Sequence, residues 1–383
     1  MENDLKVLMI SSDRNILVHG SVVSERMKEY GALVKELHIV LLSDSSHGLN
    51  KAQLAKNVWV YPTNSLTSFL RPFNAARLGK KIVFDNKFVR GQSIITTQDP
   101  FECGWAGLGV KKRWRLPLEV QLHTDPFSPY FSGFVNSLRK RMARKVLHHA
   151  DSIRVVTEGL GSKISKQLKI ENSKLKILPI YVDKKKIEEG RVAFDLHARY
   201  GWHFILLTVS RLSPEKNLAL ALAVLARVRE RFKDTGLVIV GSGPEENHLK
   251  ALVKKFKLEG AVEFVGWQND LASFYKTANV FVQTSFFEGY GLSLIEAGLY
   301  GLPIITTPVG IAQELEHGKD AFIYPVGNPE LFAQGVVDLI ENNYKRENLR
   351  TNMKHTLDIK LISRADYLAQ IKDDWASIAT NIK

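Results

Sequence analysis

Short apolar runs alternate with longer amphipathic segments along nearly the whole chain of 383 residues. Runs that are apolar throughout, such as 204–207 and 237–240, are typical of strands buried on both faces of a parallel sheet. Segments between the runs, among them 216–232 and 245–256, have helical periodicity. This alternation predicts βαβ units with helices on both sheet faces. We therefore expect an α/β protein.

The expected strands fall into two series, separated by the polar stretch 182–201. The first series comprises 6–11, 37–42, 58–61, 94–97, 118–122, 153–156 and 176–178. The second series comprises 204–209, 237–240, 262–265, 280–283 and 303–306. Each series is long enough to form an open, doubly wound parallel sheet of its own.

The length of the chain also favours two domains, because it exceeds what one hydrophobic core usually organises. We expect Rossmann-like domains over 1–178 and 179–345. The remaining residues, 346–383, are expected to form a helical segment that packs back towards the N-terminal domain. Open parallel sheets bind ligands at the carboxyl ends of their strands, so the two domains are expected to face each other across a cleft.

Charge is the one unusual feature of the composition. Lys and Arg number 53 against 40 Asp and Glu, which gives a net charge of +13, and residues 1–150 carry +10 of it. A basic surplus favours an anionic partner or simply a solvated surface. The sequence has no nucleic-acid-binding motif, so we expect no specific nucleic-acid partner.

The single cysteine, Cys103, excludes a disulfide framework and is typical of a reducing cytoplasm. We expect no secretory leader and no transmembrane helix, since no apolar stretch approaches the roughly 20 residues that a span needs. Two basic clusters, Lys111 to Arg115 and Arg139 to Lys145, favour either a solvated helix face or peripheral binding to the anionic inner face of the cell membrane.

The strongest local motif runs from Glu288 to Glu296, between an expected strand and an apolar helix. Gly289 and Gly291 allow the backbone to approach a ligand and direct N–H groups at an anion. The carboxylates, one on the loop and one two turns along the helix, suit the binding of sugar or ribose hydroxyls. The alternative is a structural turn with Glu296 buried against a cation, and the spacing alone does not decide.

Arg211 and Lys216 occupy the loop after the strand 204–209. A planar guanidinium and a compact ammonium can hold a diphosphate and stabilise it as a leaving group. The alternative is an ordinary salt bridge between Arg211 and Glu215. The sequence has no Asp-x-Asp, which removes the commonest acidic bridge between a metal and a diphosphate.

The third glycine motif, Gly241-Ser242-Gly243, follows another buried strand. Glu246 stands where a dinucleotide fingerprint requires a small residue, which excludes a nicotinamide dehydrogenase. We expect a tight turn close to the ligand.

In the N-terminal half, polar residues end two expected strands. His123 and Asp125 follow one strand, and Asp99 follows another. A lone histidine is more often structural, but these positions are expected to face the ligand, and both aspartates are candidates for binding an acceptor. Gly20 opens a helix and is a further candidate contact. Motifs of α/β-hydrolases, zincins and P-loop proteins are missing from the sequence.

Taken together, these residues resemble the retaining glycosyltransferases of family 4, which have the GT-B fold. The resemblance rests on five features in family order, namely Glu288-x7-Glu296, the Arg211…Lys216 loop, Gly241-x-Gly243-Pro244, Phe264-Val265-Gly266-Trp267 and His123. One departure is Gly20-Ser21, where family members often carry two adjacent glycines.

The resemblance implies a nucleotide-diphosphate-sugar donor bound mainly by the C-terminal domain, 179–345. It implies a glycan, glycolipid or lipid-linked acceptor bound mainly by the N-terminal domain, 1–178, and neither a metal nor a cofactor. It implies transfer of a hexose-type sugar from a UDP- or GDP-sugar with retention, an activity of class EC 2.4. The implied catalytic residues are His123, Arg211, Lys216 and Glu288. The implied donor-binding residues are Gly20, Gly241, Val265, Gly266, Gly289, Tyr290, Gly291, Leu292 and Glu296. The alternative is a catalytically silent protein that binds nucleotide sugars with the same fold.

Overall fold

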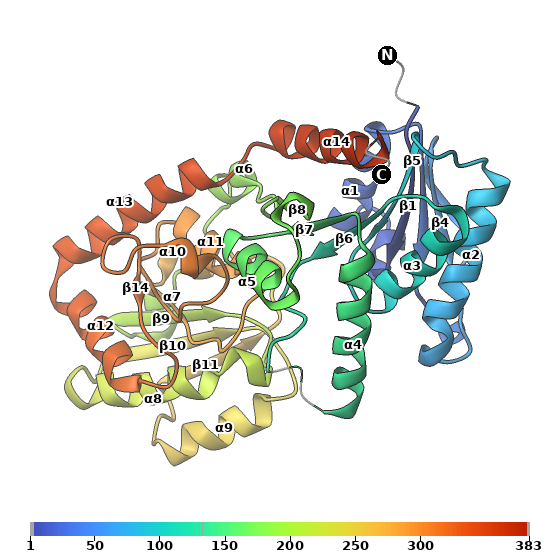
Figure 1. Cartoon of the computed structure of the whole chain (residues 1–383). Helices are drawn as coiled ribbons and strands as arrows, with labels where there is room; N and C mark the ends of the chain where they lie inside the picture. Colours follow the sequence, from blue (N-terminus) through green and yellow to red (C-terminus); the bar gives the residue numbers. More distant parts are fainter. Residues whose placement is uncertain (1–3, 130, 132, 381–383) are drawn as a thin grey trace. The chain divides into compact units, whose positions relative to one another are not determined.

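The computed structural model describes residues 4–129, 131 and 133–380, and the chain forms two compact units (Figure 1). The second unit is continuous and comprises Ile180–Ile362. The first unit combines the residues up to Pro179 with those from Ser363 onward. The chain therefore leaves the first unit once and returns to it once.

The first unit is built on an eight-stranded sheet in the order β3-β4-β2-β1-β5-β6-β7-β8, which is parallel except for the antiparallel edge strand β3. The strands are β1 (Lys6–Ser11), β2 (Glu36–Leu41), β3 (Ala52–Ala55), β4 (Val58–Pro62), β5 (Ser93–Thr97), β6 (Leu118–Leu122), β7 (Ser152–Val155) and β8 (Leu175–Ile177). The α-helices are α1 (Val22–Ala32), α2 (Arg71–Asp85), α3 (Glu102–Trp114), α4 (Phe134–His149), α5 (Glu158–Leu168) and α14 (Arg364–Thr380).

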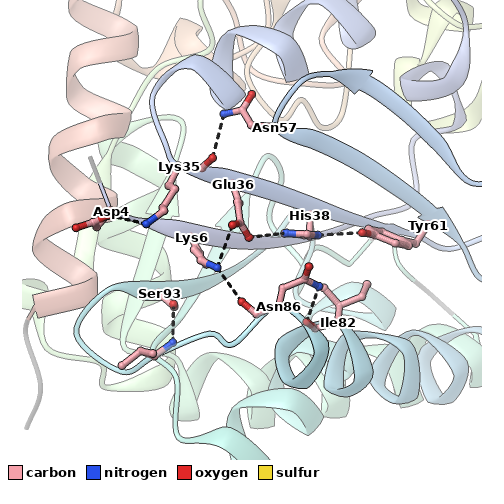
Figure 2. A network of polar contacts seen from close by, with 11 residues as sticks. Asp4, Lys6, Lys35, Glu36, His38, Asn57, Tyr61, Ile82, Asn86 and Ser93 are labelled. Carbon is pink, nitrogen blue, oxygen red and sulfur yellow. Dashed lines mark hydrogen bonds and ion pairs between the residues drawn. The ribbon is translucent and has the colours of Figure 1, made fainter. Parts of the chain in front are cut away.

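A polar network joins the amino ends of the central strands of this sheet (Figure 2). Lys6 at the start of β1 pairs with Glu36 at the start of β2 at 3.0 Å, and Glu36 Oε2 lies 3.1 Å from Nε2 of His38. Nδ1 of His38 lies 3.0 Å from the Tyr61 hydroxyl. Burial lowers the pKa of His38, so a neutral ring donates to Glu36 and accepts from Tyr61. These contacts fix the strand ends opposite to those that carry the predicted site residues.

Helix α14 is an integral part of the first unit. The fully buried Trp375 donates its indole N–H to Glu119 Oε2 of β6 at 3.1 Å, and Thr96 of β5 donates to the same oxygen at 2.5 Å. The hydroxyls of Tyr30 and Tyr367 lie 2.9 Å apart. The helix is thereby bound to both the sheet and α1.

The second unit is built on a six-stranded sheet, all parallel, in the order β11-β10-β9-β12-β13-β14. The strands are β9 (Phe204–Val209), β10 (Thr235–Val240), β11 (Val262–Gly266), β12 (Val280–Gln283), β13 (Ile304–Thr306) and β14 (Phe322–Ile323). The α-helices are α6 (Lys184–Glu188), α7 (Leu196–Tyr200), α8 (Leu218–Arg231), α9 (Glu246–Lys255), α10 (Ala272–Thr277), α11 (Leu292–Leu299), α12 (Pro329–Glu341) and α13 (Asn343–Lys360). The core of this unit packs α8 and α12 against β9 and β10.

The segment 346–383, expected to pack as one piece towards the N-terminal domain, is divided between the two units in the structure. Helix α13 belongs to the second unit and α14 to the first, with the division between Ile362 and Ser363. The buried side chains of Met353 and Leu357 pack α13 against Gly298 of α11 in the second unit. Trp375 holds α14 in the first unit. The segment is therefore not one body. Among the described helices, none has both the length and the apolar character needed to cross a bilayer.

Candidate functional site

Two loops of the second unit are joined at the carboxyl edge of its sheet. They follow β9 and β12, which are neighbours in the sheet. The hydroxyl of Thr284 donates to the carbonyl oxygens of Lys216 and Asn217 at 3.2 and 3.0 Å. The N–H of Phe286 donates to the carbonyl oxygen of Glu215 at 2.9 Å. These bonds hold the loop with the predicted cations against the loop with the first predicted glutamate.

Lys216 and Glu288 form a close ion pair where these loops meet. Nζ of Lys216 lies 2.8 and 2.7 Å from the two carboxylate oxygens of Glu288. Ser285 adds a hydrogen bond to Glu288 Oε1 at 2.7 Å. The side chains are only 18% and 10% exposed, so the pair is largely shielded from water. Lys216 and Glu288 are therefore partners of each other in this structure, and their contacts with a ligand stay predictions.

Arg211 occupies a more open position. Nη2 lies 3.1 Å from Glu215 Oε1, the ion pair that the sequence left open as an alternative, and Ser213 donates to the same oxygen at 2.7 Å. The Arg211 side chain is 71% exposed. Exposed pairs of this kind contribute little free energy, so the guanidinium is able to turn to an anionic ligand at little cost.

Gly241 and Gly243 allow the loop with Arg211 and Lys216, called the cation loop below, to lie directly on the end of β10. A Cβ on Gly241 would lie 1.9 Å from the carbonyl oxygen of Ser210, and the backbone φ there is +131°. A Cβ on Gly243 would lie 2.2 Å from the carbonyl oxygen of Leu212. The predicted tight turn is present, and its glycines are explained by this close approach. A donor contact of Gly241 stays a prediction.

Glu296 lies on α11, which begins after Gly291 with its φ of +96°. Its Oε2 accepts a hydrogen bond at 3.0 Å from the hydroxyl of Tyr275 in α10, a residue that is fully buried. Desolvation raises the pKa of Glu296, whereas this hydrogen bond and the positive charge of Lys186 lower it. The carboxylate is thus held by a phenol and lies within the field of a cation.

The other predicted donor residues of the second unit lie on the same edge of its sheet. The ring of Tyr290 is buried, and its contact with a donor stays a prediction. Leu292 at the start of α11 is exposed, and Gly289 is half-buried. Val265 and Gly266 end β11, where both are half-buried.

In the first unit, His123 directly follows β6, and it reaches the surface although protein atoms surround it densely. Desolvation by the surrounding protein, followed by the positive charges of Arg154 and Arg26, lowers the pKa of His123 to about 4. The imidazole is therefore neutral near pH 7 and is suited to hydrogen bonding with an uncharged hydroxyl.

Asp99 and Asp125 make structural contacts. Asp99 accepts backbone N–H groups at the start of α3 at 2.7 and 3.2 Å, and burial raises the pKa of its carboxyl group. Asp125 accepts the N–H of Phe127 at 2.8 Å and pairs with Lys163 at 2.6 Å. Their roles towards an acceptor stay predictions.

Gly20 lies exposed just before α1, with a φ of +73° and open space where a Cβ would stand. Ser21, at the position of the second family glycine, caps α1 by accepting the N–H of Ser24 at 3.0 Å. The serine side chain therefore has a local structural role.

Two contacts of the site were missed in the sequence. Ser285 precedes Glu288 by three residues, and this short spacing was a usable signal. Tyr275 is separated from Glu296 by 21 residues and by the whole of β12, and no local pattern links them. Within the described residues, no group of three or more His, Cys, Asp or Glu side chains is placed to hold a metal ion.

Comparison with known proteins gives two matching family models. The model described as "Glycosyltransferase Family 4" matches residues 27–186, and the one described as "Glycosyl transferases group 1" matches residues 195–356. Together they match most of both units.

Two curated relatives have sequence identities below 30%. The chain is 26% identical, over 83% of its length and 86% of the relative's, to the N-acetylgalactosamine-N,N'-diacetylbacillosaminyl-diphospho-undecaprenol 4-alpha-N-acetylgalactosaminyltransferase of Campylobacter jejuni. It is 27% identical, over 55% of its length and 51% of the relative's, to the alpha-monoglucosyldiacylglycerol synthase of Streptococcus pneumoniae. The chain spans between 39% and 51% of the length of the first three curated relatives it matches.

Among solved structures, the chain is similar to HepE of Anabaena in complex with UDP. The TM-score is 0.76 at 19% identity, and the match covers 97% of this chain and 100% of HepE. At this identity the likeness shows the fold alone. It confirms the predicted fold class, in which two Rossmann-like α/β domains make up the GT-B fold.

Proposed function

Because the chain belongs to the group 1, family 4 glycosyltransferases, we propose that it transfers a hexose-type sugar from a UDP- or GDP-sugar to a hydroxyl group. The acceptor is a glycan, glycolipid or lipid-linked sugar, and transfer proceeds with retention and without a metal. One observation carries the proposal. Two joined loops hold Arg211, Lys216 and Glu288 together at the carboxyl edge of the second sheet.

The chemistry follows from these groups. Arg211 and Lys216 bind the donor diphosphate and stabilise the negative charge that develops as the bond between the sugar and the phosphate breaks. Glu288, released from Lys216, accepts hydrogen bonds from hydroxyl groups of the sugar. The acceptor oxygen attacks from the face that the diphosphate leaves, and its proton passes to a departing phosphate oxygen. Attack on that face preserves the anomeric configuration.

A donor screen tests this function. UDP-, GDP- and ADP-sugars are compared by thermal stabilisation, because a ligand that binds only the folded state raises its stability. We expect one UDP- or GDP-sugar to raise the melting temperature and to be consumed when acceptors are supplied. Binding without transfer or donor hydrolysis over a broad acceptor panel would instead identify the catalytically silent alternative.

The acceptor proposal extends to a lipid surface. Helix α4 exposes Phe134, at 88%, together with Val135 and Leu138 in its first turns, and the exposed cations Arg141 and Arg144 follow. Apolar side chains next to cations suit the headgroup region of an anionic bilayer. Support also comes from the names of two relatives, which refer to diphospho-undecaprenol and to diacylglycerol.

The two predicted basic clusters begin at different levels of the neighbouring helices α3 and α4. Lys111, near the end of α3, donates to the carbonyl oxygen of His149 at 2.9 Å and so lies at the last turn of α4. Arg139 pairs with Glu102 at the start of α3. These positions are separated by about 15 Å along the helix axis. We propose that membrane contact is centred on the first half of α4 and its cations, and contact through Lys111 to Arg115 stays a prediction.

Vesicle flotation tests this assignment. Changing Phe134 and Leu138 together to serine is expected to weaken binding to anionic vesicles at least about tenfold, because the burial of two large apolar side chains is lost. The matched control is Ile359→Ser, which removes an exposed apolar side chain from α13 of the second unit and should leave binding unchanged. If the unmodified protein does not float with anionic vesicles at low salt, the membrane assignment is wrong.

A further inference from the structure

Tyr275 is a buried residue of α10 whose hydroxyl is directed at a predicted ligand-binding carboxylate. The hydroxyl lies 3.0 Å from Glu296 Oε2 and 3.3 Å from the carbonyl oxygen of Ser293. Its ring stacks on Tyr300 with 5.1 Å between centroids and packs against the ring of Phe281 at 6.0 Å. The ring is thus fixed on two sides, and the position of the hydroxyl is fixed with it.

A phenol differs from a basic residue as a partner for a carboxylate. Its one proton satisfies one lone pair of Oε2 and leaves Oε1 available to accept further hydrogen bonds. It leaves the negative charge of Glu296 in place, whereas an arginine or lysine in contact would neutralise it. A charged carboxylate with one oxygen held and the other available is suited to accept hydrogen bonds from the two neighbouring hydroxyls of a ribose.

We propose that Tyr275 is a positioning residue that orients Glu296 towards the ribose of the donor and so makes the site selective for ribonucleotides over 2′-deoxyribonucleotides. The inference rests on the proposed role of Glu296 in binding the ribose. Tyr275 itself touches no part of the donor in this scheme, because it is fully buried behind the carboxylate.

The ionisation of Glu296 provides a second signature. Desolvation raises the pKa of this carboxyl group, and the hydrogen bond from Tyr275 acts in the opposite direction. Removing the phenol hydroxyl therefore raises the pKa of Glu296 further, and the carboxyl group takes up a proton at higher pH. The affinity for a ribonucleotide should then begin to fall at a higher pH, as the solution is made more acidic, than in the unmodified protein.

The test measures dissociation constants of UDP and 2′-deoxy-UDP, with GDP and 2′-deoxy-GDP in parallel, for the unmodified protein and for Tyr275→Phe, Glu296→Gln and the double variant. We expect Tyr275→Phe to reduce the preference for the ribonucleotide about tenfold while affinity for the deoxynucleotide changes less than about twofold. The double variant should match Glu296→Gln alone, since both changes remove one interaction.

Tyr200→Phe is the matched control. The hydroxyl of Tyr200 belongs to the same unit, is buried and has no hydrogen-bond partner among the described atoms. Its removal should leave the preference and its pH dependence unchanged. Thermal unfolding of each variant with and without nucleotide shows whether the second unit is folded.

The outcomes separate this inference from the proposed function. If Glu296→Gln abolishes the ribose preference and Tyr275→Phe retains it in full, the inference is wrong and the donor site stands. An equal loss of affinity for ribo- and deoxynucleotide in Tyr275→Phe would also overturn it, because a purely structural role predicts that result. If Glu296→Gln keeps the full preference, the assignment of Glu296 to the ribose is itself wrong.

Discussion

Replacing Lys216 with alanine is expected to slow sugar transfer by about a hundred- to a thousandfold, the usual effect of removing one preorganised group that stabilises transition-state charge. The ammonium is already held at the site by Glu288 and is largely shielded from water. Once Glu288 has turned from Lys216 to the sugar, the charge of the ammonium acts on the departing diphosphate with little screening by water. The measurement is the rate of transfer at saturating donor and acceptor, together with the dissociation constant of the nucleoside diphosphate.

The alanine variant also leaves the carboxylate of Glu288 without its partner, which could disturb the loop. A second variant, Lys216→Met with Glu288→Gln, removes both charges, and its comparison with Glu288→Gln alone gives the effect of the ammonium without an unpaired carboxylate. The matched control is Lys345→Ala, which breaks an ion pair of 2.8 Å with Asp338 elsewhere in the second unit and should leave transfer unchanged. If alanine at Lys216 and alanine at Arg211 both retain full activity, these residues do not bind the diphosphate.

Changing Gly241 to alanine is expected to disrupt the donor site through its backbone. The new Cβ would lie 1.9 Å from the carbonyl oxygen of Ser210, and neither atom belongs to a flexible side chain. The cation loop has to move, or the end of β10 has to distort. We expect the free energy of unfolding of the second unit to fall by about 3 kcal/mol. Nucleotide affinity should fall as well, because Arg211 and Lys216 are carried by the displaced loop.

Gly260→Ala is the comparison that isolates this steric effect. Gly260 also has a positive φ, +74°, but open space where the Cβ would stand. It should lose only about 1 kcal/mol of stability and keep its nucleotide affinity. Thermal unfolding and nucleotide titration of both variants make the comparison. Equal behaviour of the two would show that the loop adapts and that close approach does not explain Gly241.

Strands that are buried on both faces could be predicted from the sequence, whereas two short edge strands could not. The run Phe204–Val209 forms β9 with the predicted bounds, because a strand covered on both faces has to be apolar throughout. The edge strands β3 and β14 were missed. β3 has no fully buried residue and β14 has only two residues, so pairing with a neighbour rather than their own pattern makes them strands.

Only one part of the candidate site could be predicted, namely the meeting of loops that follow neighbouring strands of the sheet. The loops with Arg211, Lys216 and Glu288 follow adjacent strands, so their meeting follows from the topology. The ion pair between Lys216 and Glu288 and the contact of Tyr275 with Glu296 depend on side-chain packing between elements far apart in the chain. No periodicity or motif encodes such packing.

The first unit contains residues from both ends of the chain, and this affects the order in which the two units can fold during synthesis. The carboxylate of Glu119 receives its hydrogen bond from Trp375, which is 256 residues further along. At a ribosomal rate of about 5–20 residues per second, Glu119 waits roughly 10–50 seconds for this partner to be synthesised. The second unit is continuous, and its last residue, Ile362, is synthesised before then. The domain that is translated first is therefore the last to be synthesised in full. Until α14 has been added, the sheet of this domain lacks the contact with Trp375.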